Sequence, residues 1–225
     1  MPDGQSRPWT RHFHLGSDLE SGRVSTPSES TIKLTDRLRS QGYCLALSTV
    51  EPRKDHKTIL AAFELLWSEG VSLPLVIVGK QGWNIEALAE QLRTHESYGE
   101  RLFWIEQAGD GDVAHLISNA TCLVQASLAE GFGLAVAEAG SKGVPLFLSD
   151  LAVFREIAGK DAAYFPVRDH RALAGALSRA YRSGEWISPK DVVAMSWAES
   201  SRTLADILLG PVSREGGASA SSPQR

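Results

Sequence analysis

The chain has 225 residues, of which 43% are hydrophobic and 22% are charged, a composition typical of a globular domain and not of a disordered or fibrous chain. Its formal net charge of -4 excludes a chain-wide attraction to nucleic acid or to an anionic membrane, so we expect no nucleic-acid partner. No segment reaches the apolar length of a membrane span, and polar residues follow Met1. We therefore expect a cytoplasmic protein, or one held peripherally at the inner membrane through a further domain.

Three regions follow one another along the chain. Residues 1–31 lack sustained periodicity and are rich in Ser, Gly and Pro over 21–30, so we expect a linker with the remnant of a preceding domain. Residues 32–209 form one domain, whose size suits about 170 ordered residues. The tail 210–225 has too little apolar surface to bury and is expected to be disordered.

Short apolar runs alternate with helical stretches from residue 32 onward. Near-continuous apolar strands separated by helices indicate a parallel sheet covered on both faces, with ligands beyond the carboxyl ends of the strands. The sequence thus predicts an α/β fold, a Rossmann-like three-layer α/β/α domain with a parallel sheet of about six strands. We expect these strands near residues 43–49, 74–79, 101–105, 121–125, 144–148 and 162–165.

Several helices are predicted from their apolar spacing. A first helix is expected from Ile32, and the stretch Lys57–Trp67 places its large apolar residues close to one face, as in a helix packed on a sheet. The stretch Trp197–Leu209 is amphipathic. Cys44 and Cys122 lie in apolar strands, so we expect them to be reduced and buried.

The most informative local feature is the turn Glu130–Gly133, between a buried strand and a helix over 134–142. The two glycines of this turn let the backbone approach a bound group closely. The free N–H groups of the first helical turn, with the positive end of the helix dipole, favour a phosphate. Glu130 before the helix and Glu138 about one turn inside it can accept hydrogen bonds from hydroxyl groups on either side. A sugar nucleotide fits this pattern.

A second charged loop, Glu51–His56, follows the first expected strand. Its proline keeps the chain out of helix geometry until Asp55, which is placed to cap the next helix. Arg53 and Lys54 are thereby presented at the ligand edge of the sheet, where loops commonly carry function. The histidine that ends the loop is interpreted as a helix-start residue and not as a catalytic base.

Three motifs, in this order, resemble those of retaining, family-4-type glycosyltransferases with the GT-B fold. The loop 51–56 is followed by the E-x7-E signature, Glu-Gly-Phe-Gly-Leu-x-x-x-Glu-Ala at 130–139, and by Ser-Asp and Arg-Glu-Ile-Ala-Gly within 149–159. The resemblance covers roughly residues 43–205. The segment Phe13–Asp18 is similar to the short strand and turn that end the family's amino-terminal domain. The chain is thus expected to be the carboxy-terminal, donor-binding half of such an enzyme, truncated ahead of this segment.

The resemblance implies transfer of a hexose-like sugar, with retention, from a GDP- or UDP-linked donor to a glycan or lipid-linked acceptor in polysaccharide or lipopolysaccharide biosynthesis. In the family pattern, Glu138 holds the ribose hydroxyls and Glu130 contacts hydroxyls of the transferred sugar. Arg53 and Lys54 bind the diphosphate and stabilise the charge on the leaving group, so these two and Glu130 are the catalytic candidates. The backbone of four residues completes the phosphate site: Gly131, Phe132, Gly133 and Leu134.

The remaining site assignments are less specific. By the same resemblance the base lies along Leu102–Ala108, in which Trp104 is interpreted as a core residue, and Trp83 is a candidate for the cleft wall. Family members often carry Gly and Arg where this chain has Ser48 and Thr49, so fewer cations hold the phosphates here. The histidines show no paired ligand spacing and the acids form no Asp-x-Asp motif, so we expect no metal and no cofactor.

Other functions stay open at this point. A non-catalytic nucleotide-sugar-binding module would keep donor binding and need a separate acceptor-binding domain, in cis or in trans. A nicotinamide-dependent oxidoreductase is suggested only by Gly131-Phe-Gly133, without a third glycine. No phosphate-loop ATPase motif occurs. For the glycosyltransferase interpretation, we expect the isolated chain to be inactive because the acceptor-binding domain is missing.

Overall fold

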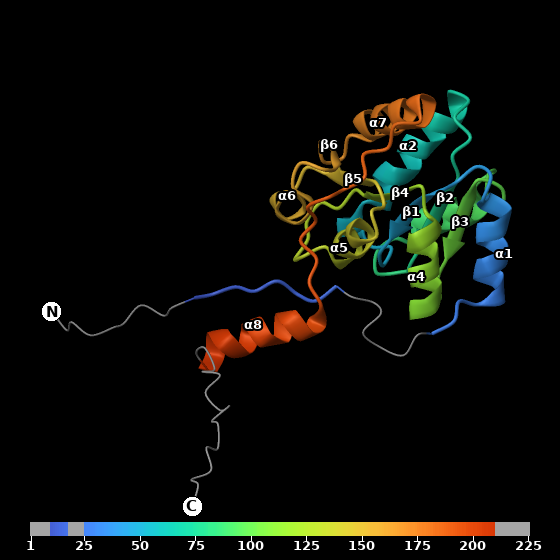
Figure 1. Cartoon of the computed structure of the whole chain (residues 1–225). Helices are drawn as coiled ribbons and strands as arrows, with labels where there is room; N and C mark the ends of the chain where they lie inside the picture. The colour runs from blue at the N-terminus through green and yellow to red at the C-terminus, as the bar shows by residue number, and fades with distance from the viewer. Residues whose placement is uncertain (1–9, 18–24, 210–225) are drawn as a thin grey trace, which may run out of the picture.

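Six parallel strands form the centre of the molecule, in the order β3-β2-β1-β4-β5-β6. The computed structural model describes residues 10–17 and 25–209 (Figure 1). Each strand falls within its predicted range or overlaps it closely, and the predicted Rossmann-like α/β fold is confirmed. The strands are β1 (Cys44–Leu47), β2 (Leu75–Val78), β3 (Leu102–Ile105), β4 (Cys122–Gln125), β5 (Leu146–Ser149) and β6 (Ala163–Phe165).

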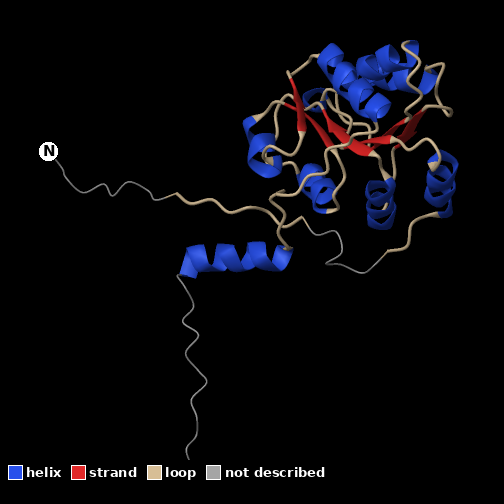
Figure 2. Cartoon of the chain, turned by 45° about the horizontal axis from the view of Figure 1, so that its top comes forward, coloured by secondary structure: helices blue, strands red, loops and turns tan. Residues whose placement is uncertain are grey.

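Helices cover both faces of this sheet, which gives three layers (Figure 2). Two separate apolar clusters result, because neighbouring residues of each strand point to opposite faces. One face is covered by α2 (His56–Ser68), α3 (Glu86–Thr94) and α7 (His170–Ser183). The other face is covered by α1 (Glu29–Leu38), α4 (Asp110–Asn119), α5 (Leu134–Ser141) and α6 (Ala152–Ala158).

The two cysteines lie side by side in the middle of the sheet. Cys44 of β1 and Cys122 of β4 are register partners, and both are free and fully buried, as predicted. Burial raises the pKa of the Cys44 thiol, and its hydrogen bond to Cys122 adds to the shift. These thiols therefore serve as small apolar residues of the core.

The structure differs from the expectation at the start of the domain. Helix α1 begins at Glu29 and not at Ile32, because Ser28 caps it: the Ser28 Oγ atom accepts a hydrogen bond from the backbone N–H of Thr31 at 3.3 Å. The Ser28 hydroxyl also donates to Asp112 of α4 at 2.7 Å. The end of the expected linker is thus the first turn of a helix that is tied to its neighbour.

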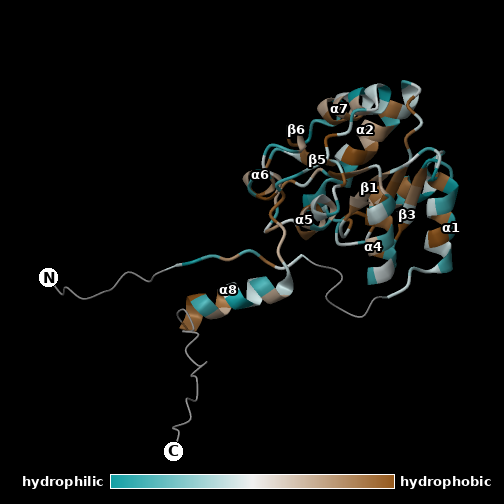
Figure 3. Cartoon of the chain, in the orientation of Figure 1, coloured by the Kyte–Doolittle hydropathy of each residue, from teal (hydrophilic) through white to brown (hydrophobic). Residues whose placement is uncertain are grey.

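A last helix, α8 (Trp197–Leu209), extends away from the three layers and runs beside the segment 10–17 (Figures 1 and 3). The Ser17 N–H donates to the Met195 carbonyl at 2.9 Å, and the Ser200 hydroxyl donates to the His14 carbonyl at 2.7 Å. The segment forms no strand over 10–17, contrary to the expectation for Phe13–Asp18, and Asp18 itself lies outside the described residues.

Two further expectations concern the ends of the chain and the membrane. The tail 210–225 lies outside the described residues. Within the described ranges, none of the helices is long and apolar enough to cross a bilayer.

Candidate functional site

 The candidate site lies at the centre of the sheet, between β1 and β4, where the order in which the strands are added reverses. Strands β1 and β4 are neighbours in the sheet, although their register partners Leu45 and Leu123 lie far apart in the chain. The loops that follow β1 and β4 therefore meet at the carboxyl edge of the sheet, which is the point where ligands bind in open α/β sheets.

An ion cluster joins these two loops. The carboxylate of Glu130 lies 2.5 Å from the Lys54 Nζ atom and 3.2 Å from the Arg53 guanidinium, and it accepts a hydrogen bond from the Ser127 hydroxyl at 2.7 Å. Arg53 also pairs with Glu51 at 2.6 Å. The structure thus brings together the three residues that the sequence analysis named as catalytic candidates, and the Glu130 side chain is only 7% exposed.

The backbone of the first loop is held by the second. Pro52–Lys54 form a 3-10 turn, which the sequence analysis did not foresee, and the Leu128 N–H donates to the Arg53 carbonyl at 2.7 Å. Asp55 precedes α2 as expected, but its carboxylate accepts from the Thr58 hydroxyl at 2.7 Å and caps no backbone N–H group. The turn therefore presents Arg53 and Lys54 in a fixed position beside Glu130.

A cavity of about 350 Å³ opens beside this ion cluster. Arg53, Lys54 and Glu130 line one part of it, and the first residues of α5 line another. The N–H groups of a first helical turn have no acceptor within their own helix, so this wall offers donors and a positive dipole end to an anion. The four predicted phosphate-site residues lie in or next to this wall, and three of them line the cavity: Phe132, Gly133 and Leu134.

The two glycines of the turn differ in what they do. Gly133 has a left-handed backbone (φ 95°), and a Cβ there would approach Phe154 to 3.0 Å. Gly131 has no such backbone, and a Cβ there would have no heavy atom within 4 Å. The fold requires a glycine at 133, whereas the empty space at 131 leaves room for a bound group.

A second cavity, of about 900 Å³, adjoins the first, and the two share Leu47, Ser48 and Thr49. The segment 106–108 lines it, so part of the predicted base-binding stretch 102–108 reaches the cleft. Trp104 does not: it is 7% exposed, and its Nε1–H donates to the Gly79 carbonyl at 2.8 Å. Trp83 is 63% exposed and lines neither of these two cavities.

Glu138 lies one helical turn into α5 and is not a member of the ion cluster. Burial raises its pKa to about 7, and the nearby carboxylate of Asp110 adds to the shift, while Lys142 opposes it. It is not among the side chains that line the two cavities. A carboxyl group with such a pKa changes its charge near neutral pH, which makes its hydrogen bonding to a hydroxyl group depend on pH.

His56 is buried in the first turn of α2. Its side chain is 1% exposed, and burial, together with the nearby charge of Lys54, lowers its pKa to about 4. The imidazole is therefore neutral at pH 7 and lies 3.4 Å from the Ser48 hydroxyl. This placement agrees with its interpretation as a helix-start residue.

The sequence analysis missed one contributor to the site. His14 comes from the segment 10–17, its Nε2 atom lies 2.9 Å from the Glu156 carboxylate, and its ring centroid is 5.8 Å from that of Phe132. Leu15, the next residue, lines the smaller cavity. The only signal in the sequence was the family-like segment itself, because a contact between residues 142 positions apart has no local pattern.

The described ranges contain no group of three or more His, Cys, Asp or Glu side chains that could hold a metal ion. The cations that line the cleft are Arg53 and Lys54 in the smaller cavity and Lys80 in the larger one.

Comparisons with known proteins agree on one family. The sequence model of the family described as "Glycosyl transferases group 1" matches residues 36–193. The chain is 36% identical over 198 residues to the serotype-specific mannosyltransferase WbdA of Escherichia coli, an alignment that covers 86% of the chain and 24% of WbdA. It is 32% identical over 154 residues to the O-antigen chain mannosyltransferase B of Escherichia coli, covering 67% of the chain and 39% of that protein. The chain thus spans about a quarter to two fifths of these relatives.

Solved structures share the fold. Sucrose-phosphate synthase from Thermosynechococcus elongatus matches with a TM-score of 0.69 at 20% identity, over 87% of this chain and 51% of that one. Anabaena HepE in complex with UDP and glucose matches with a TM-score of 0.61 at 17% identity, over 87% of this chain and 51% of that one. The three-layer domain thus corresponds to one half of a GT-B fold.

Substitution of the two glycines by alanine should have different effects. Gly133→Ala should lower the free energy of unfolding by about 1–3 kcal/mol, because the residue must keep a left-handed backbone. Gly131→Ala should change it by less than about 0.5 kcal/mol. Urea unfolding of both variants measures the difference, and equal losses would contradict the distinct roles of the two positions.

The stability of the protein should depend on the titration of Glu138. Its pKa is about 7 in the folded chain and near 4.5 in the unfolded chain, so the folded state binds the proton more tightly. The free energy of unfolding should therefore decrease as the pH rises from about 4.5 to about 7. Glu138→Gln should remove this part of the decrease, and Glu90→Gln, an exposed position on α3, is the matched control. Thermal unfolding of the three proteins from pH 4.5 to 8 is the measurement.

Proposed function

The chain belongs to the group 1 glycosyltransferases, and from this premise we propose that it is the donor-binding half of a retaining hexosyltransferase. The observation that carries the proposal is the ion cluster of Glu130 with Arg53 and Lys54, beside the first turn of α5. This arrangement places two cations, a carboxylate and free N–H groups around one cavity. A nucleoside-diphosphate sugar has the matching groups, a diphosphate next to a hydroxyl-rich ring.

The donor is proposed to be a GDP- or UDP-linked hexose. Arg53, Lys54 and the backbone of Gly131–Leu134 hold the diphosphate, Glu130 contacts hydroxyls of the transferred sugar, and Glu138 holds those of the ribose. Mannose is the first hexose to test, because the relatives WbdA and the O-antigen mannosyltransferase B are described as mannosyltransferases. The acceptor is a glycan or a lipid-linked glycan, in polysaccharide or lipopolysaccharide biosynthesis.

The ion cluster gives the two cations a role in the reaction. Their charge is balanced by Glu130 and Glu51, so a diphosphate must replace carboxylate oxygens as their partner. As the bond between the anomeric carbon and the diphosphate oxygen breaks, Arg53 and Lys54 stabilise the charge that grows on that oxygen. The acceptor oxygen forms the new bond on the same face, and its proton passes to the leaving diphosphate. No protein nucleophile is needed.

A binding module is the alternative. It has the same donor site but no turnover, and it needs a separate acceptor-binding domain in cis or in trans. Both functions fit the coverage of WbdA, because the chain spans only about a quarter of that protein and the remainder includes residues that could bind an acceptor. Either function requires neither a metal nor a cofactor in this proposal.

The two glutamates should affect ligand binding differently. Glu138→Gln should weaken the binding of both a nucleoside diphosphate and its sugar conjugate, because both contain the ribose. Glu130→Gln should weaken mainly the sugar conjugate. Each loss should be on the order of 1.5–3 kcal/mol, the range for a hydrogen bond to a charged group. Calorimetry with GDP, UDP, GDP-mannose and UDP-glucose is the measurement.

The control for this pair is Glu90→Gln, on the exposed surface of α3. Equal losses for both ligands in both variants would refute the assigned roles. No binding of any nucleotide to a folded sample would refute the donor site itself.

The isolated chain should not transfer sugar, although it should bind the donor. Transfer requires an acceptor oxygen held near the anomeric carbon, and effective molarities of roughly 10⁵–10⁸ M are lost when nothing positions it. The test is to incubate the chain with labelled donors and cell-extract acceptors, and then with an amino-terminal domain supplied in cis. Robust transfer by the chain alone would show that these residues position the reacting acceptor hydroxyl without a further domain.

A further inference from the structure

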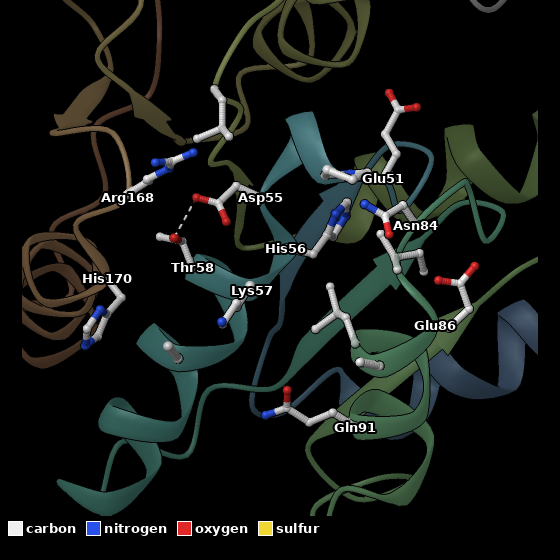
Figure 4. A pocket seen from close by; sticks show the side chains of 16 residues that line it. Glu51, Asp55, His56, Lys57, Thr58, Asn84, Glu86, Gln91, Arg168 and His170 are labelled. Carbon is white, nitrogen blue, oxygen red and sulfur yellow. Dashed lines mark hydrogen bonds between the residues drawn. The ribbon is translucent and has the colours of Figure 1, made fainter.

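A third cavity, of about 810 Å³, lies at the same edge of the sheet but outside the donor cleft, where α2, α3 and α7 begin (Figure 4). It shares no lining residue with the two cavities of the donor cleft. The loop 51–55 separates them: Arg53 and Lys54 line the donor cavity, whereas Glu51, Pro52 and Asp55 line this one. Its volume is in the range of small-molecule pockets, roughly 300–1,000 Å³.

Polar side chains reach this cavity from three elements (Figure 4). Five of them make no hydrogen bond or ion pair with any described residue: Lys57, Asn84, Glu86, Arg168 and His170. The donor site differs, because its charged side chains are already paired with one another. The polar groups of the third cavity are therefore available to a ligand.

The buried wall of the cavity contains an unsatisfied polar atom. His56 lines the cavity, and its Nδ1 atom is buried and has no hydrogen-bond partner, alone among buried side-chain N and O atoms of the described residues. A neutral imidazole nitrogen can donate or accept according to its tautomer. A hydroxyl group, which can do both, is the complementary partner, and an unpaired buried polar atom is costly without one.

The backbone around the cavity is also unusual. Asp55, Asn84 and Arg168 are the non-glycine residues with a positive φ in the described ranges, at 48°, 52° and 65°, and all three line this cavity. Such residues persist only where the surrounding structure holds them, and they gather at ligand sites.

The lining chemistry favours a neutral ligand. Carboxylates of Glu51, Asp55 and Glu86 line the cavity together with the cations of Lys57 and Arg168, so the cavity offers no excess of positive charge to a phosphate. Apolar side chains of Pro52, Ile85, Leu88 and Leu128 complete the lining. A ligand with polar edges and apolar faces matches this mixture.

We propose that the third cavity binds a neutral oligosaccharide, at a site separate from the sugar nucleotide. That this oligosaccharide is the acceptor glycan rests on the proposed function. The carboxy-terminal half would then hold a part of the acceptor chain on the far side of the loop that holds the donor diphosphate.

Calorimetric titration of the full chain with α-linked mannose oligosaccharides of one to four units tests the site, with glucose and galactose oligosaccharides in parallel. Asn84→Gly removes the amide but keeps the left-handed backbone, and Gln91→Ala changes an exposed lining residue of α3. Each should weaken oligosaccharide binding about 3- to 10-fold, the range for one neutral hydrogen bond. Gln41→Ala, at an exposed position outside the cavity lining, is the matched control and should change nothing.

Nucleotide binding, measured on the same samples, separates this proposal from the proposed function. Nucleotide binding without binding of any oligosaccharide, or oligosaccharide binding that neither variant weakens, would overturn the third-cavity site and leave the donor site intact. Oligosaccharide binding that both variants weaken, without nucleotide binding, would support the cavity site and refute the donor site. Circular dichroism confirms that each variant is folded.

Discussion

The pairing of β1 with β4 is the constraint on which the site depends. Strands that are distant in the sequence become neighbours at the centre of the sheet, so the loops that follow them meet. One loop brings Arg53 and Lys54, and the other brings Glu130. Because all six strands are parallel, their carboxyl ends lie at this one edge of the sheet, and the three cavities described above lie there.

The charges of the ion cluster balance one another within this geometry. The cations of Arg53 and Lys54 would repel each other, and the carboxylates of Glu130 and Glu51 offset that repulsion. The cluster is partly buried, so water screens it less than a surface pair. Among the described residues, Glu138 has no such cationic cluster around it, and burial together with the carboxylate of Asp110 raises its pKa, while Lys142 opposes the shift.

Much of the fold could be predicted from the sequence, because buried parallel strands such as Leu75–Val78 are continuous apolar runs between helical stretches. The helix after Gly133 was predictable from the same local pattern. Contacts between distant residues could not be predicted from the sequence. The pairing of Glu130 with Lys54 and of His14 with Glu156 has no signal in the local sequence. The start of α1 was missed because its cap, Ser28, is fixed by Asp112 far along the chain. The third cavity was missed because four separate loops contribute to its lining, each of ordinary composition.

The contact between the segment 10–17 and α8 has a mechanical consequence. Ser17 is hydrogen-bonded to Met195, and Ser200 is hydrogen-bonded to His14. A Cβ at Gly16 would lie 2.5 Å from the Trp197 Cα atom, so the segment and the start of the helix are in close contact. Leu15 of this segment lines the smaller cavity, so a displacement of α8 would also displace that part of the cavity wall.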